Sequence, residues 1–207
     1  MNFARHSNLE GQHAFLGASN YHWLNYSDDK ISEWYFKYLA KERGTRFHAL
    51  AAELIELGVK LPDKKKALNL YVNDAIGYKM STEVVLYYSP NCFGTADSIC
   101  FRKENGKDIL RIHDLKTGDI PAHMEQLRIY AALFCLEYDY NPFDIGIELR
   151  IYQSNDVKIE TPDGDVIIPI MEKIKTADKI ISRPFHRKHH PSWYSFCPHE
   201  DRHTCSY

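Results

Sequence analysis

The chain has 207 residues, enough to bury one hydrophobic core but not comfortably two, so we expect a single domain over residues 1–207. Its 44% hydrophobic and 13% aromatic residues argue against disorder, and a formal net charge of −2 argues against a protein that coats nucleic acid by charge alone. The sequence shows no run of about 18 apolar residues and no signal-peptide pattern, so we expect a cytoplasmic protein without membrane contact.

Two helices are expected in the first third of the chain. Asp28 or Asp29 is a plausible N-cap for apolar positions that recur at helical spacing over residues 31–39. Gly44 is expected to interrupt this helix, and a second helix is expected over residues 47–57. The lysine-rich stretch that follows is typical of a surface connection.

Strand-forming residues dominate the middle of the chain. The pattern predicts strands over residues 83–87, 93–102 and 109–115, with a hairpin turn at residues 103–107 between the last two. These three strands would form an antiparallel meander.

A helix that opens at Pro121 and a strand over residues 145–152 follow. Because this helix lies between two strands, it is a natural crossover that places the fourth strand in the same sheet. A small hairpin around residues 162–164 and a helix over residues 169–182 complete the core, which is expected to span about residues 30–182. The order of elements predicts an α/β fold with a mixed sheet flanked by helices.

The residues that can carry chemistry lie on the two strands joined by the hairpin. Asp114 and Lys116 are two residues apart in a strand, so their side chains point to the same face. The hairpin brings Asp97, at the end of Gly94-Thr95-Ala96-Asp97, close to both. Two carboxylates can share one Mg²⁺ or Mn²⁺ ion, and a neighbouring lysine can position water or stabilise an oxyanion. This pattern indicates metal-assisted hydrolysis of phosphodiesters.

Two polar residues on the following helix can support this site. Gln126 and Tyr130 are four residues apart and therefore share a helix face. From that face they could orient Lys116 or a phosphate group.

These motifs resemble the PD-(D/E)XK nuclease superfamily, in particular its RecB-like and phage-exonuclease branches. The resemblance rests on Gly94-Thr95-Ala96-Asp97, Asp114-Leu115-Lys116, Gln126-x-x-x-Tyr130 and Gly44-Thr45-Arg46-Phe47-His48. It implies a restriction-endonuclease-like core, dependence on Mg²⁺ or Mn²⁺, and cutting of DNA, often from an end.

The resemblance also implies further metal ligands. The histidine that matches His48 often contacts the metal in that family, and an acid on the same helix completes the site. The nearest such acid here is Glu53, five residues after His48, which corresponds to a rotation of about 140° around a helix. Its participation would require a local distortion of the helix. The Leu115 carbonyl is an additional candidate ligand.

The C-terminal extension, residues 183–207, contains a second group of potential ligands. Its cysteines and histidines could hold a tetrahedral Zn²⁺ ion, although their spacing is not a standard one and a histidine-rich tail is the alternative. The four residues are Cys197, His199, His203 and Cys205.

We therefore expect a metal-dependent DNA nuclease, most simply an exonuclease in DNA recombination, repair or phage replication. Its expected partner is single- or double-stranded DNA with an end, and it could act as a homo-oligomer or with a recombination protein, in the host cytoplasm if it is phage-encoded. Two alternatives remain open. One is a catalytically inactive nuclease fold that binds DNA or protein, and the other is an adaptor organised by zinc.

Overall fold

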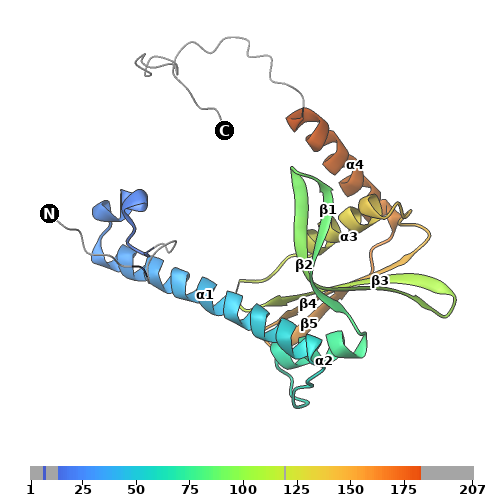
Figure 1. Ribbon diagram of the computed structural model, residues 1–207, viewed down its shortest axis with the longest axis horizontal. Coiled ribbons are helices and arrows are strands. Elements are labelled where there is room, and N and C mark those ends of the chain that lie inside the picture. The colour runs from blue at the N-terminus through green and yellow to red at the C-terminus, as the bar shows by residue number, and fades with distance from the viewer. Residues whose placement is uncertain (1–6, 8–13, 119, 183–207) are drawn as a thin grey trace, which may run out of the picture.

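The computed structural model describes residue 7, residues 14–118 and residues 120–182. Its centre is a five-stranded mixed sheet flanked by helices (Figure 1), which confirms the α/β class expected from the sequence. Within these described ranges, helices that combine the length and the apolar character needed to cross a membrane are absent.

The strands follow one another across the sheet in the order β1-β2-β3-β4-β5. The meander of β1, β2 and β3 is antiparallel, β4 lies parallel to β3, and β5 returns antiparallel to β4. The β2–β3 turn is formed by Asn105 and Gly106, whose φ values of 49° and 84° are those that a two-residue hairpin requires. The strands are β1 (Ser81–Ser89), β2 (Cys92–Glu104), β3 (Lys107–Lys116), β4 (Gly146–Gln153) and β5 (Asp156–Glu160).

Helices cover both faces of the sheet. The short 3₁₀ segment η2 (Ala18–Asn25) precedes α1 (Asp28–Glu56), α2 (Ala67–Gly77), α3 (Glu125–Glu137) and α4 (Gly164–Ile181). α3 and α4 lie on one side of the sheet, and α2 and the C-terminal part of α1 lie on the other (Figure 1). Leu110 and Ile112 of β3 belong to the cluster on the α3 side, and Leu115 belongs to the cluster on the α2 side. Successive strand residues face opposite sides, so β3 contributes to both hydrophobic clusters.

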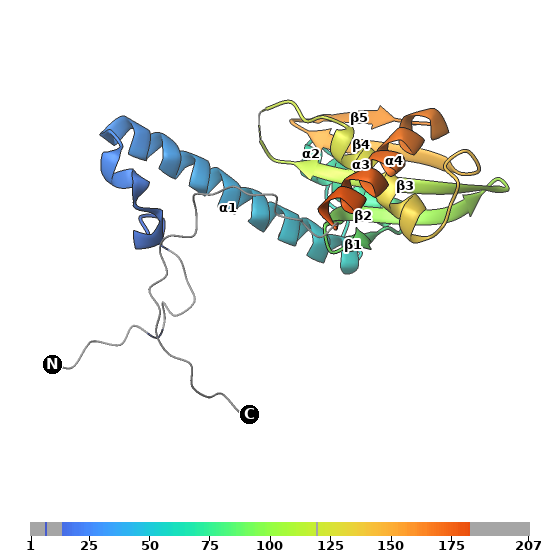
Figure 2. The same cartoon turned by 90° about the horizontal axis from the view of Figure 1, so that it is seen from above.

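The N-terminal helix differs from the expectation. α1 is one continuous helix of 29 residues, so the predicted interruption at Gly44 is wrong, and Ser27 rather than an aspartate caps it by accepting a hydrogen bond from the Lys30 amide. Gly44 instead allows α1 to lie close to the end of β3, because a Cβ atom there would be 3.1 Å from Thr117 Oγ1. The N-terminal half of α1 extends away from the sheet (Figure 2), where Trp34 packs on Phe15.

Two further elements depart from the sequence pattern. The hairpin predicted at residues 162–164 is wrong, because Asp163 is the N-cap of α4 and accepts a hydrogen bond from the Asp165 amide. The actual hairpin turn is at Ser154 and Asn155, between β4 and β5. α3 begins at Glu125, four residues later than the predicted start at Pro121.

Two residues of α3 that differ in burial should contribute very differently to the stability of the fold. Leu133 is 1% exposed and Ile129 is 40% exposed. We expect Leu133→Ala to lower the free energy of unfolding by about 3 kcal/mol, through lost burial and the cavity left behind. Ile129→Ala should cost less than about 1 kcal/mol. Urea unfolding measures both, and equal losses would contradict this account of the core.

Candidate metal and catalytic site

Asp97, Asp114 and Lys116 are brought together at the end of β3, next to β2. The Leu115 backbone amide donates a hydrogen bond of 3.0 Å to Asp97 Oδ2, which ties the two strands together at this point. Lys116 Nζ lies 3.0 Å from Asp114 Oδ1 and 2.9 Å from Asp114 Oδ2. The geometry that the hairpin predicts is therefore present, while the chemical role of each residue stays a prediction.

Gln126 and Tyr130 extend this arrangement onto α3. Lys116 Nζ donates to Gln126 Oε1 at 2.9 Å, and Gln126 Nε2 donates to the Tyr130 hydroxyl at 3.0 Å. Gly94 makes room for the tyrosine, because a Cβ atom at residue 94 would lie 2.8 Å from a ring carbon of Tyr130. The ammonium group of Lys116 is thus held from two sides, by a carboxylate and by an oriented amide.

His48 and Glu83 complete a group of potential metal ligands around Asp97. His48 Nδ1 lies 3.1 Å from Asp97 Oδ2. One ligand atom from each of His48, Glu83 and Asp97 lies within 4.8 Å of the other two, so this group could hold a metal ion. The sequence reasoning missed Glu83, which belongs to β1 and lies outside the recognised motifs in the sequence.

The β1–β2 ladder is interrupted where Glu83 and Asp97 face each other. Paired residues flank the position on both sides, Thr82 with Ser98 and Val84 with Ala96, but Glu83 and Asp97 themselves are not paired. Glu83 has a φ of 50°, a left-handed value that is uncommon for residues other than glycine and asparagine. Like charges directly across two strands repel each other. A bound cation would offset this repulsion.

Burial increases the need for positive charge at the site. Asp114 is 2% exposed, and its Oδ2 atom accepts no hydrogen bond despite lying near the lysine ammonium. Burial and the neighbouring Asp97 raise the pKa of the Asp114 carboxyl, an effect that Lys116 partly opposes. Glu83 is exposed, yet partial desolvation of its carboxylate and the neighbouring Asp97 still raise its pKa. An anionic, partly desolvated set of oxygen atoms of this kind fits a hard divalent cation.

His48 adds a dependence on pH. Its hydrogen bond with Asp97 raises the pKa of the imidazole. Metal coordination requires the neutral ring, so protons and metal compete for this residue. Metal affinity should therefore fall as the pH drops through the raised pKa of His48.

The structure does not bring every predicted ligand to this group. Asp114 and Glu53 are not part of the His48–Glu83–Asp97 set, and Glu53 is exposed on α1, so metal ligation by either residue stays a prediction. Leu115 is buried, and ligation by its carbonyl likewise stays a prediction. The predicted zinc ligands lie outside the described residues; they are Cys197, His199, His203 and Cys205.

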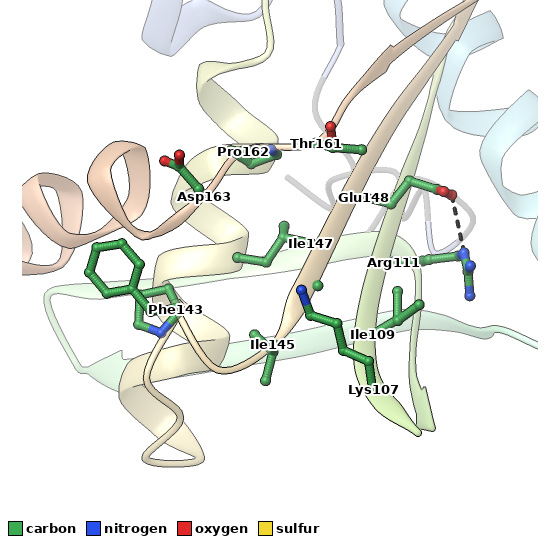
Figure 3. A pocket seen from close by; sticks show the side chains of 12 residues that line it. Lys107, Ile109, Arg111, Phe143, Ile145, Ile147, Glu148, Thr161, Pro162 and Asp163 are labelled. Atoms are coloured by element: carbon green, nitrogen blue, oxygen red, sulfur yellow. Dashed lines mark hydrogen bonds and ion pairs between the residues drawn. The ribbon is translucent and has the colours of Figure 1, made fainter. Parts of the chain in front are cut away.

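Two pockets lie near opposite ends of β3. The first, of about 360 Å³, is lined by Lys107, Ile109 and Glu148 among others, at the N-terminal ends of β3 and β4 (Figure 3). It is therefore at the far end of the strand from Lys116. The second, of about 190 Å³, includes Lys116 in its lining and adjoins the candidate site.

The sequence matches no protein-family model and no curated protein sequence. Among solved structures, the crystal structure of SSO0001 is similar to this chain, with a TM-score of 0.32 and 16% sequence identity over 54% of this chain and 57% of that chain. The chain thus spans a little over half the length of that protein.

A single substitution tests whether Glu83 belongs to a metal site. Glu83→Gln keeps the shape of the side chain and removes one carboxylate, so we expect Mn²⁺ affinity to fall about tenfold or more. The matched control is Glu53→Gln, which removes the same charge from an exposed position on α1 and should leave the affinity unchanged. Isothermal titration calorimetry measures both, and equal affinity for wild type and Glu83→Gln would exclude Glu83 as a ligand.

Glu83→Gln should weaken metal binding but stabilise the metal-free protein. Without metal, loss of the repulsion between Glu83 and Asp97 should make Glu83→Gln more stable than wild type. The pKa of Glu83 is raised in the folded state, so the wild type gains stability as Glu83 takes up a proton. The advantage of the variant should therefore shrink as the pH falls through the raised pKa of Glu83. Urea unfolding in EDTA at several pH values measures the difference in free energy of unfolding between the variant and wild type. A difference that does not change with pH would contradict the proposed repulsion between Glu83 and Asp97.

Proposed function

We propose that this protein is a metal-dependent deoxyribonuclease that hydrolyses phosphodiester bonds of DNA and acts from DNA ends. The observation that carries the proposal is the Lys116 ammonium, held between Asp114 and Gln126 beside the His48–Glu83–Asp97 group. A cation next to a metal-binding carboxylate cluster suits a reaction in which negative charge develops on a phosphate group. The resemblance of these motifs to PD-(D/E)XK nucleases supports the same conclusion, and the preference for ends rests on that resemblance alone.

The donor set favours particular ions. A divalent ion held by Asp97, His48 and Glu83 or Asp114 would neutralise phosphate charge and lower the pKa of a bound water molecule. The carboxylates suit Mg²⁺ and Mn²⁺ equally, but the imidazole nitrogen favours Mn²⁺. Mn²⁺ should therefore support activity at a lower concentration than Mg²⁺.

Each protein residue has a definable task in this reaction. Asp114 and Gln126 hold Lys116 Nζ at distances of 3.0 Å and 2.9 Å. From this position Lys116 would donate a hydrogen bond to the attacking water or to a phosphate oxygen as charge develops. Tyr130 fixes the side-chain amide of Gln126, so that its oxygen rather than its nitrogen faces the lysine. Gln126 and Tyr130 are positioning residues.

Removal of the Lys116 ammonium tests the proposal. We expect Lys116→Ala to slow metal-dependent degradation of end-labelled linear DNA by about a hundredfold to a thousandfold, as expected for loss of one preorganised donor. The control, Lys37→Ala, removes an ammonium group paired with Glu33 on the exposed part of α1 and should leave the rate unchanged.

Parallel assays with closed circular DNA, and with EDTA in place of metal, define the type of cleavage. Degradation of linear DNA but not of circles supports an exonuclease, whereas cutting of circles would make the enzyme an endonuclease. Absence of turnover on linear and circular DNA with both Mg²⁺ and Mn²⁺ would refute the proposed activity.

A further inference from the structure

The smaller pocket beside the site has a composition that suits one nucleotide of a DNA strand. We refer to it as the Arg43–Phe47 pocket; its lining includes Arg43, Phe47, Leu68, Leu115, Lys116 and Asn155. We propose that this pocket binds the nucleotide next to the scissile phosphate, with its base against Phe47 and a phosphate near Arg43. The identity of the ligand rests on the proposed nuclease function.

The pocket and the metal-binding group have no described residue in common, but neighbouring residues connect them. Phe47 lines the pocket, and the next residue, His48, belongs to the metal-binding group. Leu115 and Lys116 both line the pocket, while the Leu115 amide binds Asp97 and the Lys116 ammonium binds Asp114. A strand bound with one phosphate at the metal would therefore place a neighbouring nucleotide at the pocket.

The charge of the pocket favours an anionic ligand. Arg43 contributes positive charge, and the part of the lining that the structure describes contains no aspartate or glutamate. Ala67, the first residue of α2, also lines the pocket, and Lys66 immediately precedes it. A helix N-terminus carries a partial positive charge that adds to that of Arg43. A phosphate group would be stabilised by both.

The aromatic wall favours a base rather than a simple anion. The Arg43 guanidinium carbon lies 5.5 Å from the centre of the Phe47 ring, so the two side chains already form a cation–π pair. Bases stack on aromatic rings and on guanidinium planes regardless of sequence. Leu68 and Leu115 add apolar surface to the same pocket.

The size of the pocket limits its occupant. Its volume of about 190 Å³ is smaller than the roughly 300–1,000 Å³ of sites that enclose a whole small-molecule ligand. A single nucleotide of a longer strand is therefore a better fit than a free cofactor. The rest of the strand would lie outside the pocket.

Binding of a fluorescein-labelled oligodeoxythymidylate of about ten nucleotides, measured by anisotropy in EDTA, tests the proposal without turnover. Loss of a stacking platform or a phosphate contact should weaken binding about fivefold to tenfold, so we expect this effect for both Phe47→Ala and Arg43→Ala. Arg43→Ala should also reduce the slope of log affinity against log salt by about one phosphate contact.

Control variants on α1 distinguish an effect specific to the pocket from a general loss of positive charge or aromatic surface. Arg46→Ala removes the same charge one turn away, from a side chain that is 81% exposed, and Phe36→Ala removes an aromatic ring that is 68% exposed. Both should bind within about twofold of wild type. Phe47→Leu preserves apolar packing but lacks the ring face, so it should show the stacking loss even if Phe47→Ala unfolds. Equal losses in the pocket variants and their controls, or no loss in any, would overturn the proposal.

Failure of this inference is distinguishable from failure of the nuclease proposal. If wild type degrades DNA with Mn²⁺ but binding and degradation are indifferent to Arg43→Ala and Phe47→Leu, the pocket is wrong and the nuclease stands. If the binding losses appear as expected while wild type shows no turnover, the pocket is supported in a protein that binds DNA without cutting it.

Discussion

The site depends on the accumulation of negative charge around Asp97. Its Oδ2 atom accepts the Leu115 amide at 3.0 Å and lies 3.1 Å from His48 Nδ1, so one carboxylate oxygen joins β2, β3 and α1. Asp114 is buried nearby, and Glu83 lies in register with Asp97 on the neighbouring strand. Carboxylates concentrated in this way destabilise the folded chain unless cations face them. Desolvation and the charge of Asp97 together raise the pKa values of Glu83 and Asp114.

Close packing of the elements around this charge explains two glycines whose role is not evident from secondary structure. Gly44 lies within a continuous helix, where glycine normally costs stability relative to alanine. At this position a Cβ atom would be 3.1 Å from Thr117, so the glycine brings α1, and with it His48, against the end of β3. Gly94 does the same for α3 by admitting the Tyr130 ring. Both glycines therefore allow close approach between elements, while the chemical groups of these two motifs are supplied by His48 and Asp97.

Sequence reasoning predicted the elements whose signal is local. The meander, the parallel crossover and the alternation of Asp114 and Lys116 follow from periodicity and turn residues, and the structure confirms them. The role of Gly44 was not predicted because it is a tertiary contact. The helix α2 was not predicted at all, and its N-cap residue, Lys66, makes no side-chain cap hydrogen bond. Glu83 was missed for a related reason, since only the β1–β2 register places it opposite Asp97. That register could have been derived once the turn after β1 was located.

On the face of β3 opposite Asp114, the buried histidine and the nearby arginines do not supply positive charge to the carboxylates of the site. His113 adjoins Asp114 in sequence but points to the opposite face, where its Nδ1 lies 3.2 Å from the Tyr152 hydroxyl. Burial and the nearby Arg150 and Arg111 lower the pKa of His113 to about 3, so it is neutral at physiological pH. Arg150 is itself paired with Asp74 at 2.9 Å. Among the described residues, the charge opposite Asp97 and Asp114 therefore comes from Lys116 and, when protonated, His48. A metal ion would bind only the neutral form of His48, so the ion must replace the positive charge of the protonated imidazole. Metal binding is therefore coupled to the stability of the folded site.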